Sequence, residues 1–194
     1  MQGEKLVYHA GIMSDSDRLL TAVILATDEE ADLPACIESL KPLGCQILVI
    51  DGGSTDATAA LAAKAGARVE QRKLDDFTKQ REYSLSLVTT PWVLQIDADE
   101  RLTPTLASGI TAALASDTAD AYMIGFAVEF MGRVMRFSGL NHERHLRLFK
   151  NDAVTFHQDK SVHESFTLAG ASRLGSLPGK MFHRPYADLP EYLR

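Results

Sequence analysis

Short apolar runs alternate with helix-like segments over the first two thirds of the chain. Runs rich in β-branched residues predict buried strands at 21–26 (TAVILA), 46–50 (QILVI) and 91–96 (PWVLQI), a weak strand at 68–71 (RVEQ) and a long one at 122–130 (YMIGFAVEF). The segments between them predict helices over 30–41, 56–65, 77–88 and 103–115. This order is typical of an α/β fold in which helices flank a mostly parallel, Rossmann-like sheet.

Turn and capping residues mark the ends of several of these segments. Pro42 and Gly44 are expected to end the first helix, and Ser54 and Thr55 to cap the second. Thr103 is expected to cap the fourth.

After residue 133 the alternation stops, and short strands and loops follow, with LRLF (146–149) the clearest strand. We expect a mixed sheet in this half. Residues 1–20 are interpreted as a tag or loose N-terminal tail and 21–194 as one domain, because a chain of 194 residues forms about one domain. The segment 188–190 is typical of a helix start but only four residues follow it, so we expect the natural protein to continue beyond Arg194.

Composition and charge narrow the classes of function. Lys and Arg total 20 against 26 Asp and Glu, a net charge of −6, so the chain offers no electrostatic basis for binding nucleic acid. Its 2 cysteines form neither a disulfide framework nor a zinc site, and no run of about 18 apolar residues occurs. A cytoplasmic location is therefore expected.

Acidic residues follow three of the predicted strands. Asp97 and Asp99 come directly after 91–96, Asp51 after 46–50, and the segment TDEE (27–30) after 21–26. Since ligands of open α/β sheets bind outside the carboxyl ends of the strands, Asp51 and Asp97 are expected to face one crevice. Such a cluster is costly by mutual repulsion, which implies a divalent metal.

Two carboxylates one residue apart can divide the work of binding. One can accept hydrogen bonds from a ribose while the other holds Mg²⁺ or Mn²⁺ that bridges a diphosphate. The alternative is that this acidic strand end only caps the next helix. Likewise, the segment 52–56 (GGSTD) can be a simple turn and helix cap, whereas Asp51 before it is expected to face the crevice.

The order of these motifs resembles the family 2 glycosyltransferases, in particular the bacterial lipopolysaccharide core group of the WaaE type. The resemblance covers about residues 20–184 and rests on TDEE, DGGSTD, the pair Gln80-Arg81, DADE, LRLFK and Val162-His163-Glu164. It implies a GT-A fold with an acceptor half in the mixed sheet. It also implies an inverting, metal-dependent enzyme that moves a sugar from a nucleotide-diphospho-sugar, UDP-sugars foremost, to a glycan or lipid-linked acceptor such as lipopolysaccharide core.

The resemblance also assigns roles to residues of the donor site. Thr27, Glu29 and Asp51 would hold the base and ribose, Arg81 would lie near the nucleotide, Asp97 would contact the ribose, and Asp99 would hold the metal. Two positions depart from the family pattern, since Asp28 and Glu82 stand where the family commonly has Asn. Both changes add negative charge beside the expected anion site, so they bear on the choice of donor.

Glu164 is the candidate catalytic base. Inverting transfer needs a carboxylate that takes the proton of the acceptor hydroxyl as its oxygen attacks the anomeric carbon. The resemblance places the Val162-His163-Glu164 motif near the acceptor. The alternative is a structural carboxylate oriented by His163, which itself is read as a hydrogen-bonding neighbour.

Between residues 133 and 150 the charge balance reverses. Five basic side chains, Arg144 and Arg147 among them, stand against the single acid Glu143, a local charge of +4. A solvated basic face is one reading. The other is a site for a phosphorylated or lipid-linked acceptor at an anionic membrane surface, with peripheral association at the inner face of the cytoplasmic membrane.

Three other functions fit the sequence less well than glycosyl transfer. A sugar-1-phosphate nucleotidylyltransferase would need a glycine-rich basic loop after the first strand, where this chain has ATDEEAD. A phosphatase of the haloacid dehalogenase type would need Thr or Val where Arg101 stands. A non-catalytic domain that binds nucleotide sugars is disfavoured by the presence of Asp97, Asp99 and Glu164.

Overall fold

The computed structural model describes residues 19–73, 76–116, 118–130, 133–134, 144–156 and 166–184. The first half of this chain forms the parallel part of the sheet. It runs β1 (Leu20–Ala26), α1 (Leu33–Leu40), the short 3₁₀ helix η2 (Lys41–Leu43), β2 (Gln46–Asp51), α2 (Thr58–Lys64), β3 (Arg68–Gln71), α3 (Phe77–Ser86) and β4 (Trp92–Asp97).

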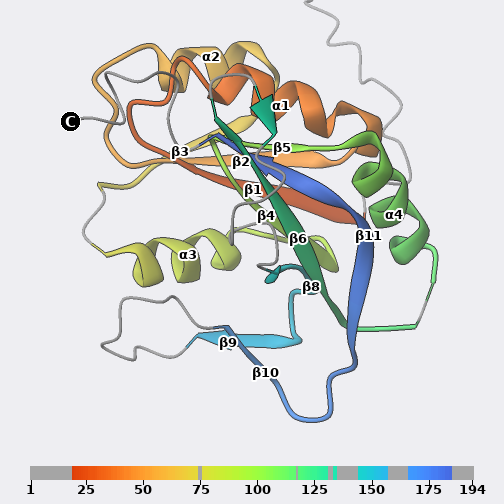
Figure 1. Cartoon of the computed structure of the whole chain (residues 1–194). Helices are drawn as coiled ribbons and strands as arrows, with labels where there is room; N and C mark the ends of the chain where they lie inside the picture. The colour runs from red at the N-terminus through yellow and green to blue at the C-terminus, as the bar shows by residue number, and fades with distance from the viewer. Residues whose placement is uncertain are drawn as a thin grey trace, which may run out of the picture.

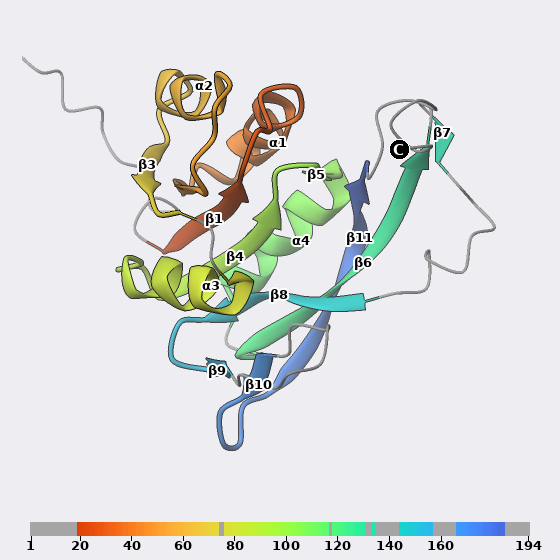
Figure 2. The ribbon, with the colours of Figure 1, turned by 90° about the vertical axis from the view of Figure 1, so that its left-hand side faces the viewer.

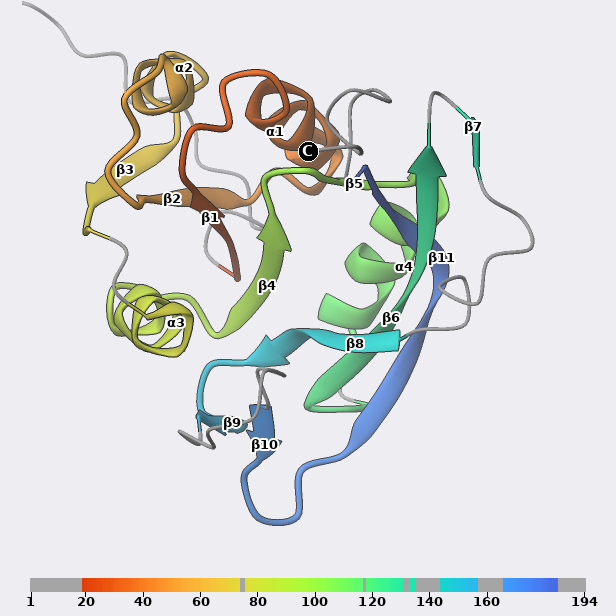
Figure 3. The ribbon, with the colours of Figure 1, turned by 60° about the vertical axis from the view of Figure 1, so that its left-hand side comes forward.

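The strand register decides where the acidic residues lie. β1 pairs in parallel with β2 on one side and with β4 on the other, so Ala26 is opposite Asp51 and Leu25 is opposite Asp97. β3 extends the parallel sheet beyond β2. The carboxyl ends of β1, β2 and β4 therefore meet at one edge (Figure 3).

The second half of the chain completes a mixed sheet. It runs β5 (Glu100–Leu102), α4 (Pro104–Leu114), β6 (Ala121–Phe130), β7 (Arg133–Val134), β8 (Arg144–Lys150), β9 (Val154–Phe156), β10 (Phe166–Leu168) and β11 (Leu174–His183). The strand order is β3-β2-β1-β4-β8-β6-β11-β5, with β7 on β6, and β9 and β10 form a separate hairpin (Figure 1). β8 is antiparallel to both neighbours, and β5 is antiparallel to β11.

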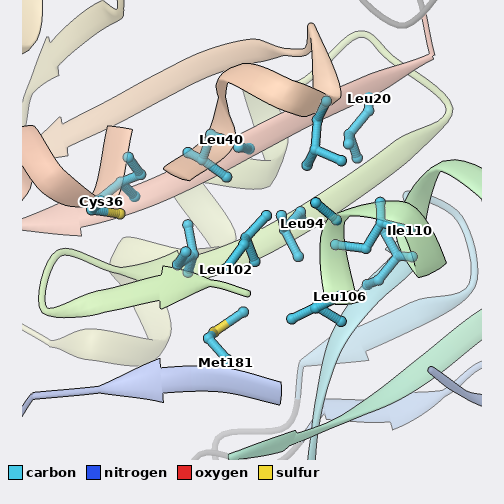
Figure 4. Packing of buried hydrophobic residues seen from close by; sticks show 14 of the residues in the cluster. Leu20, Cys36, Leu40, Leu94, Leu102, Leu106, Ile110 and Met181 are labelled. Atoms are coloured by element: carbon cyan, nitrogen blue, oxygen red, sulfur yellow. The ribbon is translucent and has the colours of Figure 1, made fainter. Parts of the chain in front are cut away.

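Helices cover both faces of this sheet (Figure 2). One core contains apolar side chains from α1, α2 and α4 together with β1, β4 and β11. Figure 4 shows part of it, with Cys36 of α1, Leu102 of β5, Leu106 of α4 and Met181 of β11. A second core lies on the opposite face, where Tyr83, Leu85 and Leu87 pack against residues of β1, β4 and β8. No helix within the described ranges combines the length and apolar character needed to cross a membrane.

The elements expected in the first 130 residues are confirmed, with shifted ends. α1 begins at Leu33 rather than residue 30, because residues 27–32 form a loop in which Asp32 precedes the first turn. Thr103 caps α4 as expected, since its side chain accepts a hydrogen bond from the Leu106 backbone N–H. The prediction that Ser54 and Thr55 cap α2 is wrong.

α2 begins at Thr58, two residues later than a cap at Thr55 would require, and its N-cap Ala57 makes no side-chain capping bond. The Ser54 hydroxyl instead donates to Asp51, and the Thr55 hydroxyl donates to Asp28. These two side chains are therefore used to join loops rather than to start a helix.

Candidate functional site

A pocket of about 410 Å³ lies at the carboxyl ends of β1 and β4. Its wall combines residues from the end of β1 and the following loop, from β2, from α3, from the end of β4 and the following turn, and from the end of β11. They are Leu25, Ala26, Thr27, Glu29, Ile50, Gln80, Arg81, Asp97, Ala98, Asp99 and His183. The sheet register thus collects five of the predicted donor-site residues, Thr27, Glu29, Arg81, Asp97 and Asp99, around one cavity.

Asp97 is held by two arginines. Its carboxylate lies 2.9 Å from Arg147 Nη2 and 3.4 Å from Arg81 Nη2, and Arg81 also donates to Gln95 Oε1 at 2.8 Å. Burial opposes ionisation of this carboxyl, but the charges of Arg147 and Arg81 outweigh burial and hold the pKa of Asp97 well below its usual range. Asp97 is therefore an ionised, oriented hydrogen-bond acceptor at the pocket wall.

Glu100 belongs to the same buried network. One of its oxygens accepts the Asp97 backbone N–H at 2.9 Å, and the other lies 2.7 Å from Arg147 Nη2. Burial raises the pKa of Glu100 to about 7, against the charge of Arg147, and the charge of Asp97 adds to the increase. The turn that carries Asp99 is thus fixed by bonds on both sides.

Asp99 and His183 form a pair in the wall of the pocket. Asp99 Oδ2 lies 3.0 Å from His183 Nε2, and the Arg184 backbone N–H donates to the Asp99 carbonyl at 3.1 Å. The hydrogen bond to Asp99 raises the pKa of His183 despite partial burial. Within the described ranges no three His, Cys, Asp or Glu side chains form a metal-binding group, so this pair offers at most two protein ligands.

Asp51 does not belong to the pocket wall. Its side chain is fully buried, its Oδ1 accepts from the Ser54 backbone N–H at 3.0 Å and from the Ser54 hydroxyl at 2.5 Å, and Gln71 Nε2 lies 3.4 Å from its Oδ2. In this arrangement Asp51 organises the loop after β2.

The loops after β1 and β2 are joined by reciprocal bonds. Asp28 Oδ1 accepts the Thr55 backbone N–H at 2.7 Å, while the Asp28 backbone N–H donates to the Ser54 hydroxyl at 3.0 Å. The Glu29 backbone N–H donates to Thr58 Oγ1 at 2.8 Å. Asp28 has a left-handed backbone with φ of 55°, a conformation that both Asp and Asn adopt readily. This explains why Asp can stand where the family commonly has Asn.

The two basic residues expected to serve the acceptor are separated in the structure. Arg147 is turned inward to Asp97 and Glu100, and its guanidinium also lies over the Phe126 ring at 5.4 Å. Arg144 is exposed, and its guanidinium contacts the Ser176 hydroxyl. The strand β8 therefore does not present them as one basic face, and Arg147 instead contacts the carboxylates of Asp97 and Glu100.

The predicted base Glu164 and its neighbour His163 lie outside the described residues, as does Glu143. Glu82 is exposed on α3 and is absent from the pocket wall. The sequence analysis missed His183 and Glu100. His183 is 84 positions from Asp99 and is the last residue of β11, a strand that the sequence pattern does not predict, whereas Glu100 is visible in the sequence only as the end of the DADE motif.

The contacts of the acidic residues remove one reason to expect a metal. The repulsion expected between the acidic strand ends is largely offset by the protein itself, through arginines at Asp97, loop donors at Asp51 and Thr55 at Asp28. Asp99 and His183 provide one carboxylate oxygen and one imidazole nitrogen, a donor set that suits Mn²⁺ when phosphate oxygens supply the remaining ligands. The residues present therefore fit a divalent ion bound together with a diphosphate.

Comparison with known proteins agrees with this geometry. The profile of the family described as "Glycosyl transferase family 2" matches residues 21–173. The lipopolysaccharide core biosynthesis glycosyltransferase LpsC of Rhizobium meliloti is 32% identical over 167 residues, which are 81% of this chain and 62% of LpsC. An uncharacterised glycosyltransferase of Rickettsia conorii is 35% identical over 54% of this chain and 37% of its own length. The chain thus spans about one to two thirds of these relatives.

Solved structures share the fold at low sequence identity. Staphylococcus aureus TarS superposes with a TM-score of 0.64 at 15% identity, over 86% of this chain and 36% of TarS. The glucosyl-3-phosphoglycerate synthase of Mycobacterium tuberculosis superposes with a TM-score of 0.53 at 21% identity, over 70% of this chain and 58% of that enzyme. The likeness confirms a GT-A fold, and the family profile, together with the LpsC match, shows that this chain belongs to glycosyl transferase family 2.

Proposed function

We propose that this chain is the catalytic domain of a glycosyltransferase that takes a sugar from a nucleotide-diphospho-sugar, foremost a UDP-sugar. The observation that carries the proposal is the pocket at the carboxyl ends of β1 and β4, which gathers Thr27, Glu29, Arg81, Asp97 and Asp99. Asp97 is kept ionised and oriented by two arginines, so it can accept hydrogen bonds from ribose hydroxyls. S. aureus TarS, of the same fold, was crystallised with UDP.

A divalent ion, Mn²⁺ or Mg²⁺, is part of this proposal. Asp99 and His183 would hold it, and the diphosphate of the donor would supply further oxygen ligands. When bound, the ion would offset the negative charge that develops on the departing diphosphate. The M. tuberculosis glucosyl-3-phosphoglycerate synthase was crystallised with Mn²⁺ and UDP, which supports the assignment by analogy.

The chain's own residues would prepare the donor for transfer. Arg81 and Arg147 fix the Asp97 carboxylate, and Glu100 fixes the backbone of the following turn, so the groups around the leaving diphosphate are held before the donor arrives. Glu164 is proposed as the base that takes the proton of the acceptor hydroxyl, with inversion at the anomeric carbon. Asp51 would act on the base and ribose by shaping the loop after β2.

The acceptor is proposed to be a glycan or lipid-linked saccharide, with lipopolysaccharide core as the leading candidate. The support is the LpsC relative, which spans most of this chain. A location at the inner face of the cytoplasmic membrane follows from that acceptor class. It gains no support from β8, because Arg147 faces inward.

A thermal-shift screen tests the donor assignment. A ligand that binds only the folded protein raises its Tm by mass action, by an amount that grows with ligand concentration over Kd. UDP-, GDP-, ADP- and dTDP-sugars are compared with Mn²⁺ present. We expect a UDP-sugar to raise Tm most, and a screen in which no nucleotide sugar changes Tm would refute the proposal.

A further inference from the structure

Asp32, at the start of α1, contacts two arginines that are far apart in the sequence, Arg101 on β5 and Arg184 after β11. Its Oδ1 lies 2.7 Å from Arg101 Nη2 and 2.7 Å from Arg184 Nη2. All three side chains are largely buried, with Asp32 14% and Arg101 21% exposed. None of the three lines the pocket, so this cluster is not part of the pocket wall.

The two arginines belong to the two segments that carry the proposed metal ligands. Arg101 is on β5, two residues after Asp99, and Arg184 directly follows His183 at the end of β11. β5 and β11 pair antiparallel, with Arg101 opposite Phe182. The bond from the Arg184 backbone N–H to the Asp99 carbonyl continues this ladder by one step, which makes Arg101 and Arg184 diagonal cross-strand neighbours.

This ladder is short and is held from one side by α1. β5 has only three residues, too few to fix a strand position by backbone bonds alone. α1 supplies two more bonds to the same segment: Cys36 Sγ donates to the Asp97 carbonyl at 3.6 Å, and the Leu102 backbone N–H donates to the Ser39 hydroxyl at 3.1 Å. Figure 3 shows α1, β5 and the end of β11 close together.

We propose that Asp32 is a positioning residue of the donor site, which ties β5 and the end of β11 to α1 and so sets the distance between Asp99 and His183. The inference rests on the proposed function, because it assigns those two side chains to a divalent ion. Like charges on Arg101 and Arg184 would repel each other across the strand pair, and the shared carboxylate offsets that repulsion. Without it, the end of β11 has one bond fewer to the rest of the protein, and His183 is free to move away from Asp99.

The experiment measures how much Mn²⁺ strengthens UDP binding. Calorimetry gives the Kd for UDP with Mn²⁺ and with EDTA, and their ratio is the metal-dependent gain. Asp32→Asn keeps the shape and removes the charge, and we expect the gain to fall about 10-fold, the lower end of what loss of an outer-shell partner costs in metal affinity. The Kd that Asp32→Asn shows with EDTA should stay within about 2-fold of the wild-type value, because the substitution removes no contact with UDP. A 2-fold change in Kd corresponds to little free energy.

A matched control separates positioning from loss of stability. Asp120→Asn also removes a carboxylate shared by two cations, Arg173 and Lys150, but Asp120 lies away from the pocket wall. It should leave the gain unchanged. Arg184→Gln should lower the gain as Asp32→Asn does, the double variant should be no worse than either single one, and Arg184→Lys should recover part of it.

The outcomes distinguish this inference from the proposed function. Wild-type protein that binds UDP equally with Mn²⁺ and EDTA would refute the metal assignment, and this inference with it. A clear gain in the wild type that persists in Asp32→Asn and Arg184→Gln would overturn the positioning role alone. If Asp32→Asn does not fold, Arg184→Gln carries the test, and an unchanged gain in it overturns the inference.

Discussion

At the residue scale, Arg147 shows how the structure redirects a sequence interpretation. The surplus of basic residues between 133 and 150 predicts one basic face, either solvated or facing the acceptor. On β8, however, Arg144 is exposed while Arg147 reaches the carboxylates of Asp97 and Glu100. Counting charges along a segment does not reveal which side chains point inward, because that depends on partners from other strands.

Replacing Arg147 by methionine should destabilise the fold. The substitution leaves Asp97 and Glu100 without their shared cation, and removal of one partner of a buried ion pair costs about 3 to 5 kcal/mol. Arg144→Met, on the same strand but exposed, should change the free energy of unfolding by less than about 0.5 kcal/mol. Urea unfolding of both variants measures this. Similar losses in the two would contradict the inward role of Arg147.

Glu164 remains a prediction from the family resemblance, and its test is kinetic. Glu164→Gln keeps the shape of the side chain and removes the base, so transfer should fall by about 10²–10⁴-fold. The loss should appear in kcat, while UDP affinity stays near wild type. Near-normal activity of this variant would show that another carboxylate is the base. An unfolded variant would favour a structural role for Glu164.

Several residues of the pocket wall could be predicted from the sequence to lie together, because their positions follow from strand ends. Thr27, Glu29, Asp97 and Asp99 each come at or just after a strand whose apolar run is unmistakable, and the structure gathers them as expected. His183 could not be predicted in this way. It reaches Asp99 only through the pairing of β11 with β5, and the polar, glycine-containing sequence of β11 has no clear strand pattern.

At the element scale, the same contrast separates the two halves of the fold. β1, β2 and β4 are buried on both faces, so their sequences are continuous apolar runs that local pattern identifies. β5 has three residues and β11 has ten with a bulge between Ser176 and Lys180. Their pairing is set by tertiary contacts, which a periodicity argument does not contain.

Gly179 marks the point where β11 bulges against α4. It has φ of 82°, and a Cβ there would lie 2.5 Å from the Leu106 backbone nitrogen. Gly179→Ala should therefore cost about 2 to 5 kcal/mol, the sum of left-handed backbone strain and overpacking. The matched control is Gly170→Ala, where φ is 56° but no heavy atom of the described chain lies within 4 Å of the added Cβ.

Gly170→Ala should cost only about 1 to 2 kcal/mol, from the backbone alone. Thermal or urea unfolding gives both values. If the two substitutions cost the same, the close approach of β11 and α4 is not what requires glycine at position 179.

At the scale of the whole molecule, one partly buried carboxylate, Asp120, connects three strands in the second half of the sheet. Asp120 lies just before β6, within 2.8 Å of Lys150 Nζ on β8 and 3.1 Å of Arg173 Nε before β11. Hydrogen bonds from Arg173 and then Lys150 hold the pKa of Asp120 well below its usual range. Asp120 thus links β6, β8 and the start of β11.

The lowered pKa of Asp120 predicts a pH dependence of stability. A carboxyl with a depressed pKa in the folded state contributes stability above its unfolded pKa of about 3.9, and that contribution is lost as pH falls through the folded pKa. Wild type should therefore have a higher Tm than Asp120→Asn at pH 7, and the difference should narrow from about pH 4 downward. A constant difference down to about pH 2 would contradict this account.

The pocket at the ends of β1 and β4 is proposed to bind the diphosphate of a nucleotide sugar through a metal held by Asp99. Calorimetric titration of UDP into the wild-type chain and into Asp99→Asn, each with Mn²⁺ and with EDTA, tests it most directly. We predict that the wild type binds UDP at least about 10-fold more tightly with Mn²⁺ than with EDTA, because oxygens of the diphosphate would complete the coordination of the ion. Asp99→Asn should lose that difference. Equal UDP affinity of the wild type with Mn²⁺ and with EDTA would contradict the account.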